Sequence, residues 1–367
     1  MKILVLSSHT PSLFWFRVDM MKAFIEQGCE VVAVGDEPES KWTEKFSQIN
    51  VKYRQAFIQR NGTNPLKDLK TLKSLKRIIK EESPDKIFTY QAKTVIYGCL
   101  AAKKKDVEIF ALVAGMGSVF LSKTFKGKVL GSILKFEYKI ALRRAKKVFF
   151  QNQDDIQFFV DNHIVKEEKV VKINGSGVNL EKFVPQAMPK EPAFLCISRI
   201  IRDKGVIEYL EAAKIVKEKY PNVRFLLVGP YDSNPSALKE EDLKPYVEDN
   251  VVEYFGEQSN VSPYLEQCSV YVLPSYREGT PKTVLEAMAS FKAIITTDAP
   301  GCKETVEDGV NGFLVPVKDV KALAMKMVEL IEKPDVVLKM AQNGRSIVEE
   351  KFDVKKVNKQ IIDIMEL

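Results

Sequence analysis

Strand-like and helix-like stretches alternate along the whole chain, and this alternation limits the possible folds more than any other feature of the sequence. Short apolar runs at 2–7, 31–34 and 86–89 are separated by helical patterns, among them 15–27 and 66–82. This order is typical of a parallel sheet that is covered by helices on both faces. The sequence therefore predicts an α/β protein with doubly wound parallel sheets.

The alternation is interrupted once, which divides the chain into two similar halves. Between 174 and 192 the pattern gives way to Gly, Asn and Pro, and it starts again with a strand-like run at 194–198. A chain of 367 residues is long enough for two domains of ordinary size. We expect one Rossmann-like domain at 1–185 and a second at 186–350. A final helix at 351–367 is expected to pack back toward the first domain.

Composition describes an ordinary globular protein, with 45% hydrophobic and 29% charged residues. The apolar run at the N-terminus is too short for a signal peptide, and the longest weakly polar stretch, 109–121, is too short to cross a bilayer. These features predict a cytoplasmic protein. The five cysteines are scattered without paired spacing, so we expect buried, reduced thiols in place of disulfides or a zinc site.

Positive charge is concentrated in the first half of the chain. Residues 1–185 contain 32 Lys and Arg against 20 Asp and Glu, and the segment 122–150 alone contains nine basic residues against Glu137. At about 100° per residue, one helical stripe holds five of them, with apolar residues on both sides. These five are Lys128, Lys135, Lys139, Arg143 and Lys146.

Two interpretations of this basic segment stay open. A helix with a basic stripe and a broad apolar surface suits a lipid interface, which would place the protein on the cytoplasmic face of the inner membrane. A core helix with a solvated basic edge fits the pattern equally well. Nucleic acid is not expected as a partner, because the sequence contains no known reader motif.

The segment 272–287 combines the end of a strand, a turn, a helix start and two carboxylates. Thr280 can cap the helix and Pro281 suits its first position. The N-terminus of such a helix attracts phosphate groups. Glu278 stands just before this anion site and Glu286 lies within the helix. Since carboxylates accept hydrogen bonds from hydroxyl groups, the combination favours a phosphorylated sugar. A surface helix with solvated glutamates is the plainer alternative.

A second loop carries cations that suit the same ligand. The segment ISRIIRDKG at 197–205 follows the first strand of the second half, so Arg199 and Lys204 are expected at the carboxyl end of that sheet. Together they can hold a diphosphate and stabilise the charge that it gains as a leaving group.

At this point the sequence resembles the retaining glycosyltransferases of the GT-B fold, in the family often called GT4. The resemblance covers nearly all of the second half. The matching residues are Arg199, Lys204, Gly205, Leu227, Val228, Gly229, Phe255, Gly256, Leu273, Pro274, Ser275, Glu278, Gly279, Leu285, Glu286, Ala287, Met288, Ala289, Glu307, Asp308, Gly309, Asn311 and Gly312.

The resemblance implies a role for each of these site residues. Arg199 and Lys204 would bind the donor diphosphate, Glu278 the reacting side of the donor sugar and Glu286 the ribose hydroxyls. Further donor contacts would come from the helix start and from the loop beside the base. These are Gly279, Thr280, Pro281 and Leu285, and then Gly256 and Glu257.

The first half is similar to members of the family that act on polyprenyl-diphosphate-linked sugars in capsule, exopolysaccharide and N-glycan assembly. The similarity lies in FALVAGMGSVF at 110–120 and, in the second half, VGPYDSNPS at 228–236. It implies a UDP-sugar donor, with an N-acetylhexosamine as the best guess, and a polyprenyl-diphosphate-linked acceptor. Residues on the acceptor and membrane side would be His9, Arg17, Gly115, Gly117, Lys135, Lys139 and Arg143. A nucleotide-sugar epimerase of the same fold, or a non-catalytic nucleotide-sugar-binding module, is the alternative.

The sequence also departs from the family pattern. The histidine that many members carry is missing at 114–117, no glycine precedes Gly28, and Phe291 stands where a glycine is usual. No Asp-x-Asp occurs, so we expect metal-independent transfer without a cofactor. We expect same-face substitution, in which the leaving UDP oxygen helps to deprotonate the acceptor and Glu278 orients the donor sugar.

Overall fold

A computed structural model of the chain describes residues 1–59, 64–102, 107–116, 120, 124–233 and 236–367. The chain forms two compact units. The first unit contains Met1–Ser176 together with Val354–Leu367, and the second contains Gly177–Asp353.

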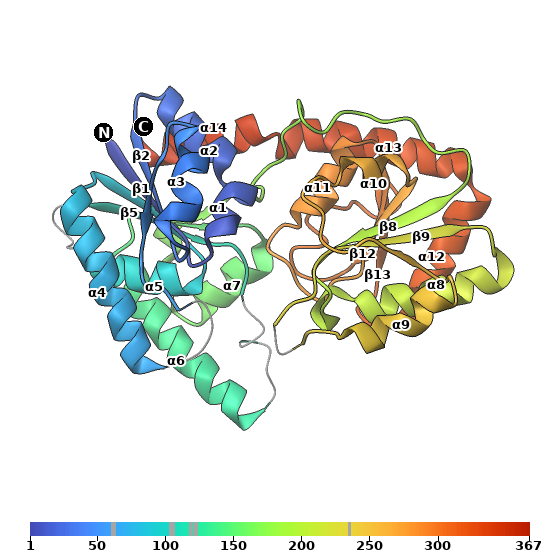
Figure 1. Cartoon of the computed structure of the whole chain (residues 1–367), viewed down its shortest axis with the longest axis horizontal. Helices are drawn as coiled ribbons and strands as arrows, with labels where there is room; N and C mark the ends of the chain where they lie inside the picture. The colour runs from blue at the N-terminus through green and yellow to red at the C-terminus, as the bar shows by residue number, and fades with distance from the viewer. Residues whose placement is uncertain (60–63, 103–106, 117–119, 121–123, 234–235) are drawn as a thin grey trace. The chain divides into compact units, whose positions relative to one another are not determined.

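The first unit is built on a parallel sheet of seven strands in the order β3-β2-β1-β4-β5-β6-β7 (Figure 1). All the pairings within it are parallel. The strands are β1 (Lys2–Leu6), β2 (Glu30–Gly35), β3 (Lys52–Gln55), β4 (Lys86–Tyr90), β5 (Glu108–Val113), β6 (Lys147–Phe150) and β7 (Val170–Lys172).

Helices cover both faces of this sheet. Alternate residues of its strands point to opposite faces and pack into two separate hydrophobic clusters. In β1, Leu4 and Leu6 pack toward one cluster, and Ile3 and Val5 toward the other. The first face is covered by α4 (Pro65–Glu82), α5 (Ala92–Ala101), α6 (Phe125–Leu142) and α7 (Gln153–Asp161). The second is covered by α1 (Thr10–Phe16), α2 (Val18–Glu26), α3 (Glu39–Ser47) and α14 (Val354–Met365).

The single helix predicted at 15–27 is wrong, because the chain forms two helices that meet at Arg17. Arg17 has φ −127° and ψ −2°, which is not helical, and it ends α1 and begins α2. Its side chain is buried against the rings of Tyr90 and Phe88. The periodicity of apolar residues continues through the break, so the sequence pattern alone did not reveal it.

The last helix of the chain belongs to the first unit. In α14, Val357, Ile361 and Met365 are buried in the same cluster as Phe24 of α2. The ammonium group of Lys86 binds the carbonyl oxygens of Met365 and Glu366, a favourable place for a cation at the end of a helix.

The second unit contains a parallel sheet of six strands in the order β10-β9-β8-β11-β12-β13. The strands are β8 (Ala193–Ile197), β9 (Arg224–Val228), β10 (Glu253–Tyr254), β11 (Val270–Leu273), β12 (Ala293–Thr297) and β13 (Gly312–Val315). The helices are α8 (Val206–Lys219), α9 (Glu240–Glu248), α10 (Ser262–Glu266), α11 (Lys282–Ala289), α12 (Val320–Glu332) and α13 (Pro334–Ile347), with a π-helical turn at Val348–Phe352.

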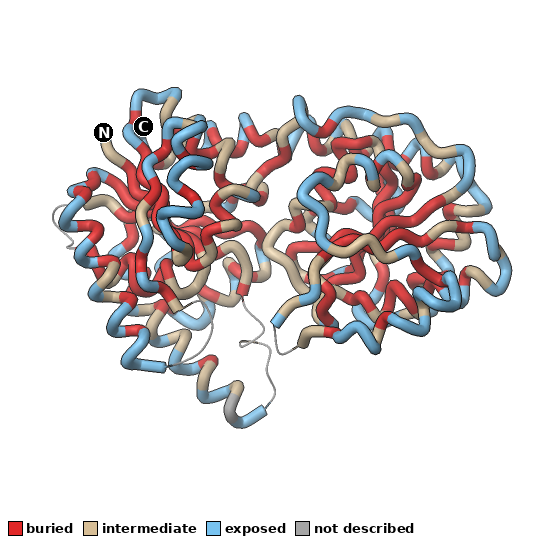
Figure 2. The backbone as a smooth tube through the Cα atoms, in the orientation of Figure 1, coloured by how far each residue is buried: buried red, intermediate tan, exposed pale blue. Residues whose placement is uncertain are grey.

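Each unit has its own interior, visible as the buried segments coloured red in Figure 2. The division between the units falls at 176/177, whereas the sequence places it at 185/186. Residues after Gly177 pack on the second sheet: Val178 and Phe183 are buried in one of its clusters, and the Val178 amide donates to the Phe352 carbonyl at 2.9 Å.

The class of fold and the state of the cysteines agree with the sequence. Two parallel sheets with helices on both faces confirm the predicted α/β class with doubly wound sheets. All five cysteines are free and buried. In the part of the chain that the structure describes, no helix combines the length and the apolar character needed to cross a membrane.

Candidate active site

The predicted site residues of the second unit gather at the carboxyl ends of two neighbouring strands. Strand β8 pairs with β9 on one side and with β11 on the other. The chain order of the strands changes direction between β8 and β11, and such a point is where doubly wound sheets bind ligands. The loop 198–205 follows β8 and the loop 274–281 follows β11.

Backbone contacts hold these two loops together. Gly205 has φ +71°, and a Cβ atom there would lie 2.0 Å from the carbonyl oxygen of Pro274. The Asp203 carbonyl accepts hydrogen bonds from the Tyr276 amide at 2.9 Å and from Ser275 Oγ at 3.2 Å. At position 205, only glycine allows both the positive φ and the close approach of the Pro274 carbonyl. The loops are therefore placed by contacts that do not involve a ligand.

Lys204 and Glu278, predicted from separate loops, form an ion pair between the Lys204 ammonium group and Glu278 Oε1. The backbone of Glu278 is fixed as well, since its amide donates to the Pro300 carbonyl at 2.9 Å. The neighbouring Gly301 has φ +80°, and a Cβ atom on it would lie 2.2 Å from the Glu278 carbonyl oxygen. Glu278 is thus positioned through both its side chain and its peptide group.

Arg199 also has a carboxylate partner, one that the sequence analysis did not identify. Arg199 Nη1 lies 2.7 Å from Asp232 Oδ2. Asp232 belongs to the loop after β9, which the sequence marked only as part of a family match. Asp232 could not be singled out because the pairing brings together residues from two separate strand ends.

The helix after Glu278 begins one residue later than predicted. Helix α11 starts at Lys282, and Pro281 occupies the cap position in an extended conformation, so Thr280 is not the cap. The first turn is anchored by Tyr271, whose hydroxyl group lies 2.7 Å from Thr283 Oγ1 and donates to the Ile197 carbonyl at 3.0 Å. Leu285 faces the hydrophobic interior and is fully buried, which excludes an exposed role for its side chain.

Glu286 is a buried carboxylate on the same helix. Burial raises its pKa above the ordinary value, and Lys282, whose ammonium group lies 3.9 Å away, opposes that rise only in part. A carboxylate that has lost most of its hydration gains from a ligand that donates hydrogen bonds. Ribose hydroxyl groups are such donors.

The loop after β10 lies beside the loop after β9. The carbonyl of Gly256 accepts from the Gly229 amide at 2.8 Å, and Gly256 has φ +65°. Glu257, the next residue, is exposed. These two predicted donor contacts therefore stand at the same edge of the sheet as Arg199.

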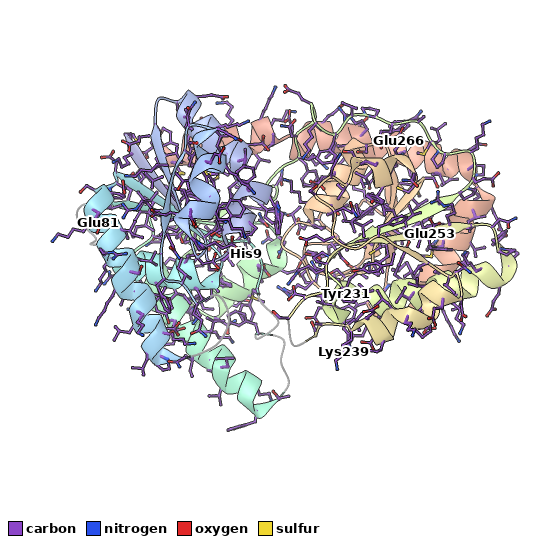
Figure 3. The ribbon with its side chains drawn as sticks, in the orientation of Figure 1. His9, Glu81, Tyr231, Lys239, Glu253 and Glu266 are labelled. Carbon is purple, nitrogen blue, oxygen red and sulfur yellow. The ribbon has the colours of Figure 1, made fainter. Side chains whose placement is uncertain are left out.

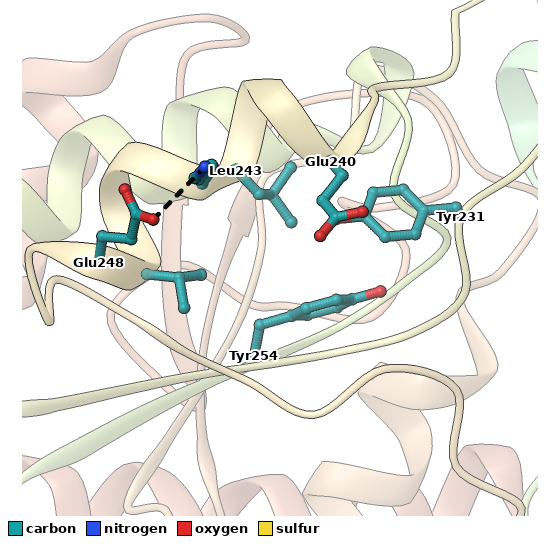
Figure 4. A pocket seen from close by; sticks show the side chains of 7 residues that line it. Tyr231, Glu240, Leu243, Glu248 and Tyr254 are labelled. Atoms are coloured by element: carbon teal, nitrogen blue, oxygen red, sulfur yellow. Dashed lines mark ion pairs between the residues drawn. The ribbon is translucent and has the colours of Figure 1, made fainter.

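A cavity of about 410 Å³ lies elsewhere in the second unit, along helix α9 (Figure 4). Tyr231 and Tyr254 face each other across it with their rings 5.6 Å apart. The other lining residues are Glu240, Leu243, Lys244, Val247 and Glu248. None of the predicted site residues lines this cavity, although Tyr231 is next in the chain to Asp232, the partner of Arg199.

In the first unit, the predicted residue His9 precedes α1 at the carboxyl end of β1 (Figure 3). Its ring packs edge-on against Trp15 at 5.8 Å. Gly115 follows β5 with φ +141°, a conformation that favours glycine. Gly117 lies outside the described residues.

A polar network lies beside His9, where β1 and β4 end. Ser7 Oγ donates to Gln91 Oε1 at 3.0 Å, and the Ser8 amide donates to the same oxygen at 2.9 Å. Gln91 has φ +70°, which is unusual for a residue other than glycine. The order of strands in this sheet also reverses between β1 and β4, so the network marks the ligand-binding end of the first unit.

Arg17, another predicted acceptor residue of this unit, is only 2% exposed. Its guanidinium group lies over the Tyr90 ring at 4.7 Å, and Arg17 Nε has no hydrogen-bond acceptor among the described residues. No described carboxylate forms an ion pair with it. Burial lowers its pKa, with Tyr90 acting in the opposite direction.

Three predicted residues lie on or just after α6. Lys135 binds Asn162 Oδ1 at 2.8 Å, Lys139 is partly exposed, and Arg143 is exposed where the helix ends. Lys146 does not extend this stripe, because it follows the helix and binds Glu108 Oε1 at 2.6 Å. On one side of the stripe the apolar side chains are exposed, with Phe125 81% and Phe136 64% accessible.

Metal ligands do not gather in the described ranges. Among these residues, no group of three or more His, Cys, Asp and Glu side chains is placed to hold a metal ion. The cations of the candidate site are Arg199, Lys204 and Lys282.

Family models match both units of the chain. Residues 179–347 match "Glycosyl transferases group 1", and residues 2–152 match "Glycosyl transferase 4-like".

Individual proteins are similar over most of the chain. An N,N'-diacetylbacillosaminyl-diphospho-undecaprenol alpha-1,3-N-acetylgalactosaminyltransferase from Campylobacter jejuni is 32% identical, over 94% of this chain and 93% of its own. A UDP-Gal:alpha-D-GlcNAc-diphosphoundecaprenol alpha-1,3-galactosyltransferase from Escherichia coli is 27% identical, over 80% of this chain and 78% of its own. The crystal structure of Anabaena HepE in complex with UDP has a TM-score of 0.78, with 19% identity and both chains fully covered.

Proposed function

Because this chain belongs to the group 1 glycosyltransferases, we propose that it transfers a sugar from a UDP-sugar to a polyprenyl-diphosphate-linked saccharide, with retention of configuration at the transferred carbon. The observation that carries the proposal is the joint placement of Lys204, Glu278 and the start of α11 at the strand end where such sheets bind ligands.

The donor diphosphate is assigned to the cations of this site. Arg199 offers two parallel donors to phosphate oxygens, Lys204 offers a point charge, and the first amides of α11 supply the positive end of a helix dipole. Both cations have carboxylate partners, Asp232 and Glu278. A diphosphate therefore competes with these carboxylates for the two cations. When it binds Lys204, the Glu278 side chain becomes available to the sugar.

The transfer itself follows from these positions. The bond between the sugar C1 and the β-phosphate oxygen breaks, and its electron pair stays on that oxygen. Arg199 and Lys204 stabilise the charge that develops there. The acceptor hydroxyl forms the new bond on the same face of the sugar and gives its proton to the leaving oxygen, while Glu278 stabilises the positive charge on the ring. The Glu286 carboxylate accepts hydrogen bonds from the ribose.

The acceptor class rests on the two relatives, whose names both describe transfer to sugars on diphospho-undecaprenol. We assign acceptor contacts to His9, Arg17 and Gly115 at the ligand-binding end of the first sheet. The transferred sugar is proposed to be an N-acetylhexosamine, in line with the name of the Campylobacter relative. No divalent metal is required in this scheme, because Arg199, Lys204 and α11 carry the charge.

An acceptor of this kind lies in a membrane, and α6 suits attachment to the inner-membrane surface. Its exposed apolar residues follow one another at helical spacing: Phe125, Val129, Ile133, Phe136 and Ile140. Lys139 and Arg143 lie beside them. A helix with this pattern lies in the plane of a lipid interface.

The experiment that tests the proposal is a panel of UDP-sugars assayed against polyprenyl-diphosphate-linked saccharides, with and without a metal chelator. We expect release of UDP that depends on the lipid-linked acceptor, persists with the chelator and disappears in Glu278→Ala. The product should carry the same anomeric configuration as the donor. Conversion of the donor sugar into its epimer without transfer would contradict the proposed reaction. A glycosyl adduct on Glu278 would contradict it as well.

A further inference from the structure

Helix α4 presents a face that has no role in the proposed transfer. At 100° per residue, six of its exposed side chains fall on one stripe of the helix. They are Leu66, Leu69, Lys70, Lys73, Arg77 and Lys80, called here the α4 face. The two leucines occupy the first turns, where Leu66 is 74% and Leu69 48% exposed. The helix thus begins with an apolar end and continues with a row of cations.

The acidic residues of α4 are held by partners elsewhere in the unit. Asp68 Oδ1 lies 2.6 Å from the ammonium group of Lys93, and Asp68 is nearly buried. Glu81 binds Arg54 at 2.7 Å, and the buried Glu82 binds Lys52 at 2.8 Å.

The lysines of the helix, in contrast, are left without carboxylates. Lys70, Lys73 and Lys80 have no ion-pair partner among the residues described by the structure, and the same is true of Lys67 and Lys76. The acids of α4 are thus paired within the folded unit, and Glu81 also lies 3.7 Å from Arg77 of the α4 face. The lysines of the helix stay exposed.

The same arrangement holds for α6, which is joined to α4 through α5. Helix α5 packs between α4 and α6, and the N-terminal ends of α4 and α6 both lie at the lower edge of the unit in Figure 1. The only acid of α6, Glu137, accepts a hydrogen bond from Tyr97 of α5 at 3.1 Å. Lys93 and Tyr97 of α5 therefore hold acids from both neighbours. The outer surfaces of α4 and α6 are left cationic and apolar.

We propose that the α4 face binds the headgroups of anionic lipids, as a second membrane contact beside α6. The positive charge of the α4 face is complementary to a negatively charged bilayer. The exposed leucines at its start favour lipid over a polar polymer such as nucleic acid. The two helices make different contributions. Helix α6 supplies mainly apolar insertion, and the α4 face supplies attraction that depends on lipid charge and salt. The inference extends the membrane attachment proposed above and does not depend on the identity of the sugars.

The test is co-sedimentation of the purified full chain with phosphatidylcholine vesicles, with and without phosphatidylglycerol, over a range of salt concentrations. The variant is Lys70→Glu, Lys73→Glu and Lys80→Glu together. Its matched control is Lys214→Glu, Lys321→Glu and Lys339→Glu, which makes the same charge change at exposed lysines of the second unit. Thermal unfolding of each protein shows whether it is folded.

We expect the α4 variant to lose at least roughly 100-fold in affinity for anionic vesicles, since each of the three lost cations contributes about 1 kcal/mol and the new carboxylates are repelled. Its binding should depend much less on salt, and the control should bind like the wild type. In contrast, Phe136→Ser on α6 should weaken binding to vesicles of both compositions and keep the salt dependence.

Equal losses in the α4 variant and the control would overturn the proposal, because they would reflect net charge alone. Unchanged binding of the folded α4 variant would overturn it as well. So would preferential binding of a short RNA duplex over anionic vesicles at the same ionic strength. If vesicle binding behaves as expected but no sugar is transferred, the proposed function fails while the α4 face stands.

Discussion

The ammonium group of Lys204 lies against the carboxylate of Glu278, so the cation expected at the diphosphate and the carboxylate expected at the sugar form one ion pair. The pair satisfies two charged groups that would otherwise be partly buried and uncompensated. In the proposed reaction it also sets a competition, because a diphosphate that binds Lys204 has to displace Glu278. Under this proposal, donor binding and release of the Glu278 carboxylate are linked in one step.

This linkage predicts opposite effects of two substitutions on UDP binding. Glu278→Gln removes the competitor of the diphosphate, so it should bind UDP more tightly while its kcat falls by roughly 100-fold. Lys204→Ala removes a charge-assisted contact, so it should bind UDP about 10-fold more weakly. Titration calorimetry and initial rates measure both effects. Weaker UDP binding by Glu278→Gln would show that the carboxylate does not compete.

Gly301→Ala should displace Glu278 without changing any charged group. A Cβ atom on Gly301 would lie 2.2 Å from the Glu278 carbonyl oxygen. The backbone must therefore move to relieve this clash. Gly309→Ala is the matched control, because Gly309 has φ +74° and no atom within 4 Å of its own Cβ position. Both variants should lose about 1 kcal/mol of stability through backbone strain. Only Gly301→Ala should also lose kcat, by at least about 10-fold.

The buried carboxylate of Glu286 should make stability depend on pH. Its pKa is raised above the ordinary 4.5 by burial, so the folded chain binds this proton more tightly than the unfolded chain. The destabilising contribution of Glu286 is therefore absent below pH 4.5 and grows as the pH rises through the raised pKa. Glu286→Gln should unfold at a higher temperature than the wild type at neutral pH, and the difference should shrink toward pH 4.5. Thermal unfolding at several pH values measures this, and a difference independent of pH would contradict it.

Arg17 allows a functional role to be separated from a structural one. A buried guanidinium group without a carboxylate partner contributes little to stability, and Arg17 has none among the described residues, so Arg17→Met should leave the unfolding temperature unchanged or raised. If Arg17 contacts the acceptor, the same variant should raise the KM for the lipid-linked acceptor and leave the KM for the donor unchanged.

Arg17→Lys provides the control for this prediction. Lysine keeps the charge but lacks the planar group that packs on Tyr90, so it should restore the acceptor KM only in part. A large fall in the unfolding temperature of Arg17→Met, with unchanged KM values, would assign Arg17 to structure alone.

Much of the fold could be predicted because it follows from local periodicity. The helix predicted at 66–82 and the strand at 194–198 are found within a residue of their predicted bounds. The break at Arg17 could not be predicted from local periodicity. It results from the packing of the Arg17 side chain against Tyr90 at the end of β4, and tertiary contacts of this kind can override local helix preference. Similarly, Phe291 takes φ +68° where the family uses glycine, which only the tertiary structure reveals.

The candidate site was predictable in its residue types and less so in its pairings. Arg199, Lys204, Glu278 and Glu286 stand in matching motifs, so the sequence identified them. Their partners lie far apart in sequence, and a single chain carries no signal that Asp232 would bind Arg199. Nor does it show which glycine touches Glu278, since many glycines follow strands and the close approach of Gly301 depends on how two loops pack.

The placement of α14 has a consequence for how the protein is made. The helix covers one face of the first sheet, yet it is synthesised after the entire second unit. On the ribosome, the first sheet therefore waits with Phe24 and its neighbours uncovered while residues 177–353 emerge. The first unit completes its core last, and a chaperone that shields apolar surface would be expected to act on that waiting face.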